Sequence, residues 1–182
     1  MPRYIKQAIE KGTRTTTGVP GKNYWQNFGK YDVKVQLDPT AKTVHGNETI
    51  LYTNNSPDTL KQLAIRFVNN VHKPNAARAN YASDDYLTSG LKIKFFKLNG
   101  QVYEVNSGDW GTVKLSDFGQ KILPGTVATL EISWEYPLSV ESDRDGMLNA
   151  STFYCAYSYP RVSVYDDYNG WDMLPHNGRQ EF

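Results

Sequence analysis

The residues that could bind a metal ion or activate a water molecule are few in this sequence and widely spaced. Its three histidines are His45, His72 and His176. A helical zinc site of the H-E-x-x-H type needs two histidines four residues apart, with a glutamate directly after the first, and no pair has that spacing. His45 and Glu48 come nearest, but a spacing of three on a strand places two side chains on opposite faces. We therefore interpret both as polar surface residues.

Acidic residues between Glu141 and Gly146 resemble the first half of a calcium-binding loop. An EF-hand loop needs Asp at its first position and a bidentate Glu at its twelfth. Those positions hold Glu141 and Thr152 here. The mismatch favours a solvated acidic loop, with a looser cation site as the alternative.

Two further groups could act as a nucleophile or as acid–base catalysts. Cys155 has no histidine near it in the sequence, and its tyrosine neighbours favour a packed thiol. Asp166 and Asp167 could form a catalytic carboxylate pair, but Asn169-Gly170 follows them and favours a turn. The sequence has neither a phosphate-binding glycine loop nor a G-x-S-x-G nucleophile turn. By its motifs, the chain carries no catalytic apparatus of its own.

Composition and charge exclude several classes of protein. The 182 residues include 20 Lys plus Arg and 19 Asp plus Glu, and no basic run provides a face for nucleic acid. A single cysteine cannot form a disulfide within the chain. No stretch approaches the ~20 apolar residues of a membrane-spanning helix. The 13 Tyr, 7 Phe and 4 Trp are typical of strands and of surfaces that contact another molecule.

Alternation of apolar and polar residues predicts strands over much of the chain. The pattern is clearest in residues 31–37, where it places alternate side chains on one buried face; these are Tyr31, Val33, Val35 and Leu37. Further strands are expected over residues 43–53, 63–67, 91–95 and 127–136. Asn99-Gly100 suits a two-residue hairpin turn because both residue types tolerate positive φ.

The remaining segments define the predicted organisation. Residues 1–25 are rich in Gly, Pro and Thr and are expected to form an extended arm, whereas residues 69–90 are expected to form a long surface loop. No amphipathic helix of three turns is predicted. Residues 26–182 are then a single all-β domain, an antiparallel β-sandwich or saddle-like sheets with long loops.

Three segments, in this order and spacing, resemble the N-terminal domain of the aminopeptidase N family of zinc metallopeptidases in its bacterial members. They are Gly18-Val-Pro-Gly-Lys-Asn-Tyr-Trp-Gln26; Tyr31-Asp-Val-Lys-Val-Gln-Leu-Asp-Pro39 with Val44-His-Gly46 and residues 49–60; and Tyr159-Pro-Arg-Val-Ser-Val-Tyr-Asp-Asp167 with Gly170-Trp171 and Glu181-Phe182. The resemblance runs from about residue 18 to the end.

The resemblance implies a supporting role for this chain. In the family, the N-terminal β-saddle packs against a thermolysin-like domain that holds the zinc ion and the glutamate that activates its water. The implied partners are therefore the catalytic domain of the same polypeptide and a peptide substrate, with no cofactor in this chain and zinc in the absent catalytic domain. Bacterial relatives also suggest export to the cell envelope or periplasm.

The resemblance also implies which residues face the substrate. In the family, a segment just before the position of Tyr159 lines the substrate pocket and often supplies a Gln or Glu for the substrate's amino group. Residues 153–158 contain neither, so strict aminopeptidase specificity does not follow; a tyrosine there could stack on a substrate side chain or pack between the sheets. The substrate-facing candidates are Tyr154, Ala156, Tyr157 and Tyr159, and the domain-interface candidates are Arg161, Asp166, Asp167 and Trp171.

A rival interpretation belongs to a different class of protein. The chain could be a free-standing β-sandwich that binds carbohydrate or protein through surface aromatics. That function requires a flat exposed platform of Trp and Tyr side chains, and burial of Trp134 and Trp171 between layers would count against it.

Overall fold

The computed structural model describes residues 1–141 and 144–178 and consists mainly of antiparallel strands, which confirms the predicted fold class. The elements are α1 (Arg3–Glu10), β1 (Phe28–Asp38), β2 (Thr43–Thr53), β3 (Leu63–Arg66), the 3-10 helix η1 (Val68–His72), β4 (Lys92–Leu98), β5 (Gln101–Val102), β6 (Val113–Ser116), β7 (Val127–Pro137), β8 (Asp145–Asn149), β9 (Thr152–Cys155), β10 (Arg161–Val162), β11 (Tyr165–Asp166) and β12 (Gly170–Trp171). No helix among these residues is long and apolar enough to cross a bilayer.

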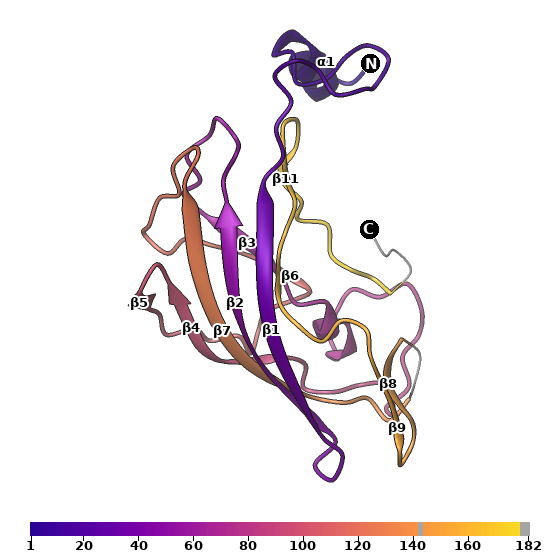
Figure 1. Cartoon of the computed structure of the whole chain (residues 1–182). Helices are drawn as coiled ribbons and strands as arrows, with labels where there is room; N and C mark the ends of the chain where they lie inside the picture. Colours follow the sequence, from indigo (N-terminus) through magenta and orange to yellow (C-terminus); the bar gives the residue numbers. More distant parts are fainter. Residues whose placement is uncertain (142–143, 179–182) are drawn as a thin grey trace.

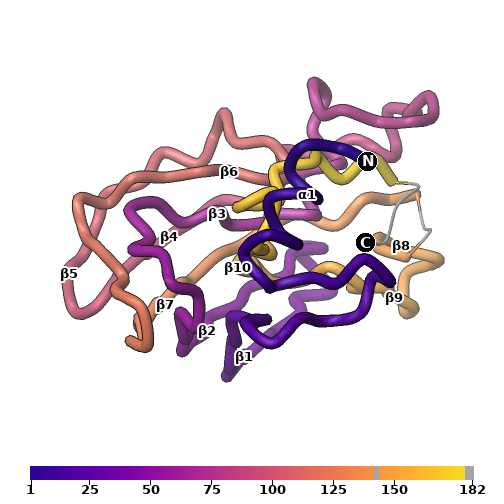
Figure 2. The backbone as a smooth tube through the Cα atoms, turned by 90° about the horizontal axis from the view of Figure 1, so that it is seen from above, coloured from indigo at the N-terminus to yellow at the C-terminus, as the bar shows by residue number. Residues whose placement is uncertain are grey.

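Two sheets form the layers of the domain. The larger sheet has five strands in the order β1-β2-β7-β4-β5, and the smaller has three in the order β10-β3-β6. Figure 1 shows β1, β2 and β7 side by side as long curved strands, and Figure 2 shows β3 and β6 lying across from them as a second layer. The short hairpins β8–β9 and β11–β12 complete the described fold.

The central strand β7 shows why the alternating pattern folds as it does. Its apolar residues occupy every second position and all point into the space between the sheets; they are Ala128, Leu130, Ile132, Trp134 and Tyr136. Burying a large apolar side chain completely contributes roughly 1.5–3 kcal/mol. The core between the two sheets is therefore the main source of stability in this domain.

The predicted hairpin turn is confirmed. Asn99 and Gly100 join β4 to β5 with φ values of 48° and 84°. Positive φ at both central residues is the requirement of a type I′ turn, whose twist matches that of the flanking strands.

The predicted buried face of β1 is only half right. Tyr31, Val33 and Leu37 do lie on one face and pack against the core, but they are half-buried, and Val35 is 46% exposed. β1 is the edge strand of the larger sheet, and the second layer does not cover the edge fully. Alternation identifies which face points inward, but the neighbouring layer decides how far that face is covered.

The prediction of a surface loop over residues 69–90 is wrong at its start. Val68–His72 forms η1, and all of its residues are buried. Asn70 can be buried because its side chain is fully bonded: its amide donates to the carbonyls of Trp110 and Gly111, and its oxygen accepts from the Leu91 amide. Polar composition therefore misled the prediction, since a satisfied amide side chain tolerates burial.

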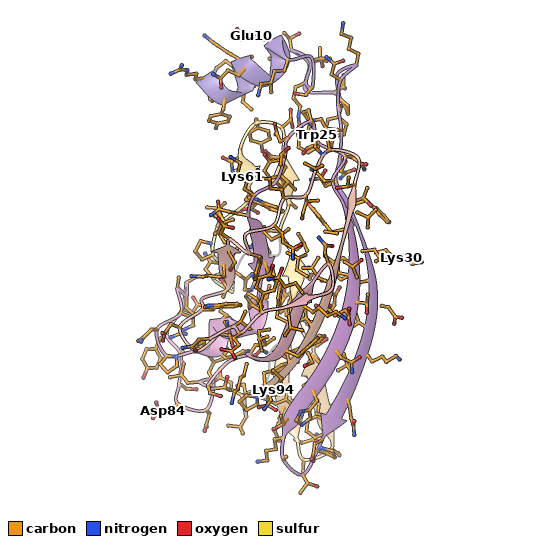
Figure 3. The ribbon with its side chains drawn as sticks, turned by 90° about the vertical axis from the view of Figure 1, so that its left-hand side faces the viewer. Glu10, Trp25, Lys30, Lys61, Asp84 and Lys94 are labelled. Carbon is orange, nitrogen blue, oxygen red and sulfur yellow. The ribbon has the colours of Figure 1, made fainter. Side chains whose placement is uncertain are left out.

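The N-terminal arm contains α1, a two-turn helix that the sequence analysis did not predict. In Figure 1 this helix stands beyond the end of β1, and Figure 3 shows Glu10 on the helix and Trp25 where the arm approaches the sheets. Ring stacking joins the arm to the β11–β12 hairpin, because Tyr4 stacks on Tyr168 and Trp25 stacks on Tyr165.

Candidate functional site

The C-terminal segment runs beside β1, as Figure 1 shows, and brings distant parts of the sequence together. The ring of Tyr159 packs edge-on against that of Tyr31, with centroids 6.0 Å apart. The Val162 amide donates to the Tyr31 hydroxyl at 3.1 Å across 131 positions of sequence. These contacts fix the segment around β10 against the half-covered face of the larger sheet.

A second group of contacts continues this junction towards the arm. Trp171 packs on Tyr52 of β2, with ring centroids 6.1 Å apart. The Tyr165 hydroxyl donates to the Asp58 carboxylate at 3.0 Å. The turn after β2 and the β11–β12 hairpin are thus held together.

A groove with a volume of about 320 Å³ lies along β10. Its polar lining residues are Tyr31, Arg66, Arg161, Ser163, Asp172 and His176, and the other five are Val68, Val162, Val164, Leu174 and Pro175. A concave surface with an apolar lining and a few convergent polar groups is the usual form of a ligand site. The groove is therefore the candidate functional site of this chain.

Arg66 of β3 holds one wall of the groove in place. Its guanidinium pairs with the Asp172 carboxylate at 2.6 Å and donates to the Leu174 carbonyl at 3.0 Å. Its Nε donates to the Ser163 hydroxyl at 3.0 Å. One side chain therefore fastens the returning C-terminal segment to the smaller sheet.

Arg161, the cross-strand partner of Arg66, and Tyr31 also line the groove. Arg161 is half-buried, and its side chain has no ion-pair or hydrogen-bond partner among residues 1–141 and 144–178. Burial raises the pKa of Tyr31, and the Val162 amide opposes that increase. A phenol and a guanidinium thus line the same groove, and the charge of Arg161 acts on Tyr31.

Two of the predicted substrate-facing tyrosines contact the lining of the groove. Tyr157 packs on the His176 ring at 5.3 Å, and Tyr159 packs on Tyr31. Tyr154 on β9 is 42% exposed, and Ala156 is also exposed. Within the described part of the chain, no hydrogen bond or ring contact joins Tyr154 or Ala156 to the groove.

The predicted interface residues divide between the groove and the β11–β12 hairpin. Arg161 lines the groove, and Trp171 packs on Tyr52 as described above. The Asp166 carboxylate accepts the backbone amides of Tyr168 and Asn169 at 3.1 and 2.6 Å, which is the geometry of a turn. Asp166 therefore has the turn role that its sequence context indicates.

Asp167 has a different role, because it anchors the arm. Arg14 donates to its carboxylate with a closest approach of 2.7 Å, and the Thr13 hydroxyl also donates to it. Burial would raise the pKa of Asp167, but Arg14 and Thr13 hold that pKa below its ordinary value. The guanidinium of Arg14 also lies over the rings of Tyr24 and Tyr168.

Glu48 corrects the interpretation of His45 and Glu48 as surface residues. Its side chain lies on the inner face of β2 and is 4% exposed, and neither carboxylate oxygen has a hydrogen-bond partner in the described structure. Burial raises the pKa of this carboxyl to about 8. The sequence did hold a signal, since Glu48 shares the even-numbered face of Val44, Ile50 and Tyr52.

The interpretation of residues 141–146 as a solvated acidic loop also needs correction. Ser142 and Asp143 lie outside the described residues, but Asp145 is buried, not solvated. Its carboxylate accepts from the Asn69 amide and lies 3.6 Å from His72 Nε2. Asp145, the first residue of β8, therefore belongs to a buried polar cluster with Asn69 and His72 of η1.

Cys155 lies beside the same cluster. Its thiol is half-buried, and burial raises its pKa, which disfavours the reactive thiolate. Among the described residues, no three His, Cys, Asp or Glu side chains are grouped so that they could hold a metal ion.

Comparison with known proteins gives one distant likeness. No protein-family profile matches the chain, and no curated protein matches it. The structure is similar to that of an M1 zinc metallopeptidase variant from Deinococcus radiodurans bound to a Tyr-Ser-Ala substrate, with a TM-score of 0.41 and 11% sequence identity. The match covers 71% of this chain and 24% of the metallopeptidase, so it spans about a quarter of that protein's length.

Proposed function

We propose that this chain is the non-catalytic N-terminal β-domain of a zinc-dependent, aminopeptidase-type protein. It packs on a thermolysin-like domain and lines that domain's substrate pocket. The observation that carries the proposal is that the resembling sequence segments pack against one another in the fold. Tyr31 and Tyr52 come from the second segment, Tyr159 and Trp171 come from the third, and the two pairs are in ring contact. Segments that jointly resemble one family thus form one structural unit.

Exposed apolar side chains at the rim of the groove support the packing role. Val164 is 62% exposed and Leu174 is 69% exposed, and Met173 beside Leu174 is also exposed. Apolar side chains gathered at one surface mark a contact with another protein when they border a polar site. The adjoining domain would cover this rim together with the uncovered part of β1.

The zinc ion of the proposed protein and its ligands belong to the adjoining domain. When bound there, zinc activates a water molecule for attack on the peptide carbonyl. The residues of this chain shape the site beside it: Tyr157 and Tyr159 pack around the groove, and Arg66 keeps its wall in place.

The placement of the tryptophans argues against the rival function, a free-standing binding module. Trp134 is 1% exposed and donates its indole N–H to the Ser158 carbonyl at 2.8 Å. Trp25, Trp110 and Trp171 are each half-buried. The tryptophans therefore form no flat exposed platform of the kind that such a module needs.

The experiment that tests the proposal is to sequence the gene beyond Phe182 and express the longer product. We expect a downstream H-E-x-x-H motif, and cleavage of amino-acyl or peptide reporter substrates that a zinc chelator abolishes. The control is the same product with the first histidine of that motif replaced by alanine, which should be inactive at unchanged solubility. A stop codon directly after Phe182 would refute the proposal.

A further inference from the structure

Two hydrogen-bond donors in the groove have no acceptor in the described part of the chain. Arg161 presents a guanidinium without an ion-pair partner there. The Tyr31 oxygen already accepts the Val162 amide, so its own O–H remains to donate, and no described residue accepts it. A guanidinium and a hydroxyl facing one hollow are suited to an oxyanion, because a carboxylate offers about four lone-pair sites.

The charges around the groove favour an anionic ligand. Arg66 and Arg161 line it with two guanidinium groups, and Asp172 supplies one carboxylate, which Arg66 already binds. Glu48 does not line the groove, but a charge on its carboxylate would act on Tyr31. Because burial keeps Glu48 protonated at neutral pH, it does not repel an anion at this site.

The shape of the site favours an extended chain. A smaller hollow of about 150 Å³ shares four lining residues with the groove, namely Tyr31, Val162, Ser163 and Val164. The two hollows thus follow the same stretch of backbone, and both have apolar lining. Tyr31 lies where the two hollows meet. A peptide that runs through both hollows therefore passes Tyr31 in its middle, so the carboxylate that it presents there belongs to a side chain and not to its C-terminus.

We propose that the groove binds the acidic side chain of an extended peptide, with Arg161 and the Tyr31 hydroxyl holding its carboxylate. The choice of a peptide rests on the proposed function, whereas the choice of a carboxylate rests on the donors alone. If the peptide is a substrate, these two residues give the parent protein a preference for an acidic residue at that position.

Calorimetric titration of the 182-residue chain with matched peptides tests this inference. The peptides are acetyl-Ala-Ala-Glu-Ala-Ala-amide and its counterpart with Gln at the centre, which differ only in the carboxylate. We expect the Glu peptide to bind at least tenfold more tightly. Equal affinities would overturn the inference. A third peptide, the Gln peptide with a free C-terminal carboxylate in place of the amide, should bind as weakly as the amidated Gln peptide, and tight binding of this third peptide alone would also overturn the inference.

Variants then assign the effect to the groove. Arg161→Gln should abolish the preference for Glu over Gln, whereas the charge-matched control Lys34→Gln, on the outer face of β1, should leave the preference unchanged. A preference that survives Arg161→Gln would overturn the inference. Should that variant fold poorly, the Arg161 side-chain N–H resonance of the unmodified chain provides the same test, because the Glu peptide must shift it and the Gln peptide must not.

Failure of this inference is distinguishable from failure of the proposed function. Zinc-dependent peptidase activity in the longer product, without discrimination between the peptides, would overturn only the carboxylate site. Discrimination by the chain, without a downstream zinc motif, would overturn only the proposed function.

Discussion

The central strand β7 and the edge strand β1 have the same alternating pattern but different surroundings. Leu130 at the centre is fully buried, whereas Leu37 at the edge is half-buried on the same inner face. The outer face carries charged side chains on both strands, and Figure 3 shows Lys30 of β1 pointing away from the molecule. The difference shows that the inner face extends beyond the layer that covers it. Under the proposed function, the adjoining domain packs on this uncovered strip.

The largest expected effect comes from truncating the two matched leucines. Leu130→Ala should lower the free energy of unfolding by about 2–5 kcal/mol, because it leaves a cavity in a closed core. Leu37→Ala should cost about 1 kcal/mol, because solvent already reaches its site. Urea denaturation of both variants gives the comparison. Equal losses would mean that β1 is covered as fully as β7.

The buried acid of β2 should make stability depend on pH. The folded chain keeps the Glu48 proton up to about pH 8, whereas the unfolded chain releases it near its ordinary pKa of 4.5. Stability that is fully present below about pH 4.5 is therefore lost as the pH rises to about 8, by roughly 3–5 kcal/mol. Glu48→Gln should remove this loss and be more stable than the unmodified chain at pH 9. Denaturant titrations at several pH values measure the free energy of unfolding of both proteins. If Glu48→Gln and the unmodified chain lost stability in parallel as the pH rises, this account would be contradicted.

The two arginines of the groove give a second matched comparison. Arg66→Lys should lower stability by about 1.5–3 kcal/mol, because a lysine cannot replace the fork that binds Asp172, Leu174 and Ser163. Arg161→Lys should change it by less than about 0.5 kcal/mol, because no described contact is lost. Hydrogen exchange at the amides of Asp172 and Leu174 should accelerate only in the first variant. Exchange that accelerates in both would show that Arg161 also has a structural role.

The smallest effect is expected on the outer face. Lys97 and Glu131 form a half-exposed ion pair with a separation of 2.7 Å. Lys97→Ala should cost at most about 1 kcal/mol, and 1 M salt should remove most of that difference, because exposed charges are screened. Thermal unfolding of Lys97→Ala and of the unmodified chain, at low and at high salt, measures this stability difference. A larger, salt-independent loss would mean that the outer face is packed, not solvated.

Much of the fold was predictable, whereas little of the candidate site was. The strand over residues 127–136 and the Asn99-Gly100 turn depend on side-chain period and local φ, both of which can be read from neighbouring residues. The resemblance identified Arg161, but it did not predict that this side chain has no partner within residues 1–141 and 144–178. Arg66 was not singled out, because the groups that it binds lie about a hundred positions away.

The sequence by itself determined the all-β class, the inward and outward faces of the long strands and the position of the tight turn, because these follow from local geometry. Only the tertiary structure decided that Glu48 is buried without a hydrogen-bond partner among the described residues, that η1 packs into the core and that Asp167 anchors the arm. Only it brought Tyr31 and Val162 into contact across 131 residues. The physical reason is that burial and pairing depend on which distant segment covers a face, and alternation along one strand carries no information about that segment.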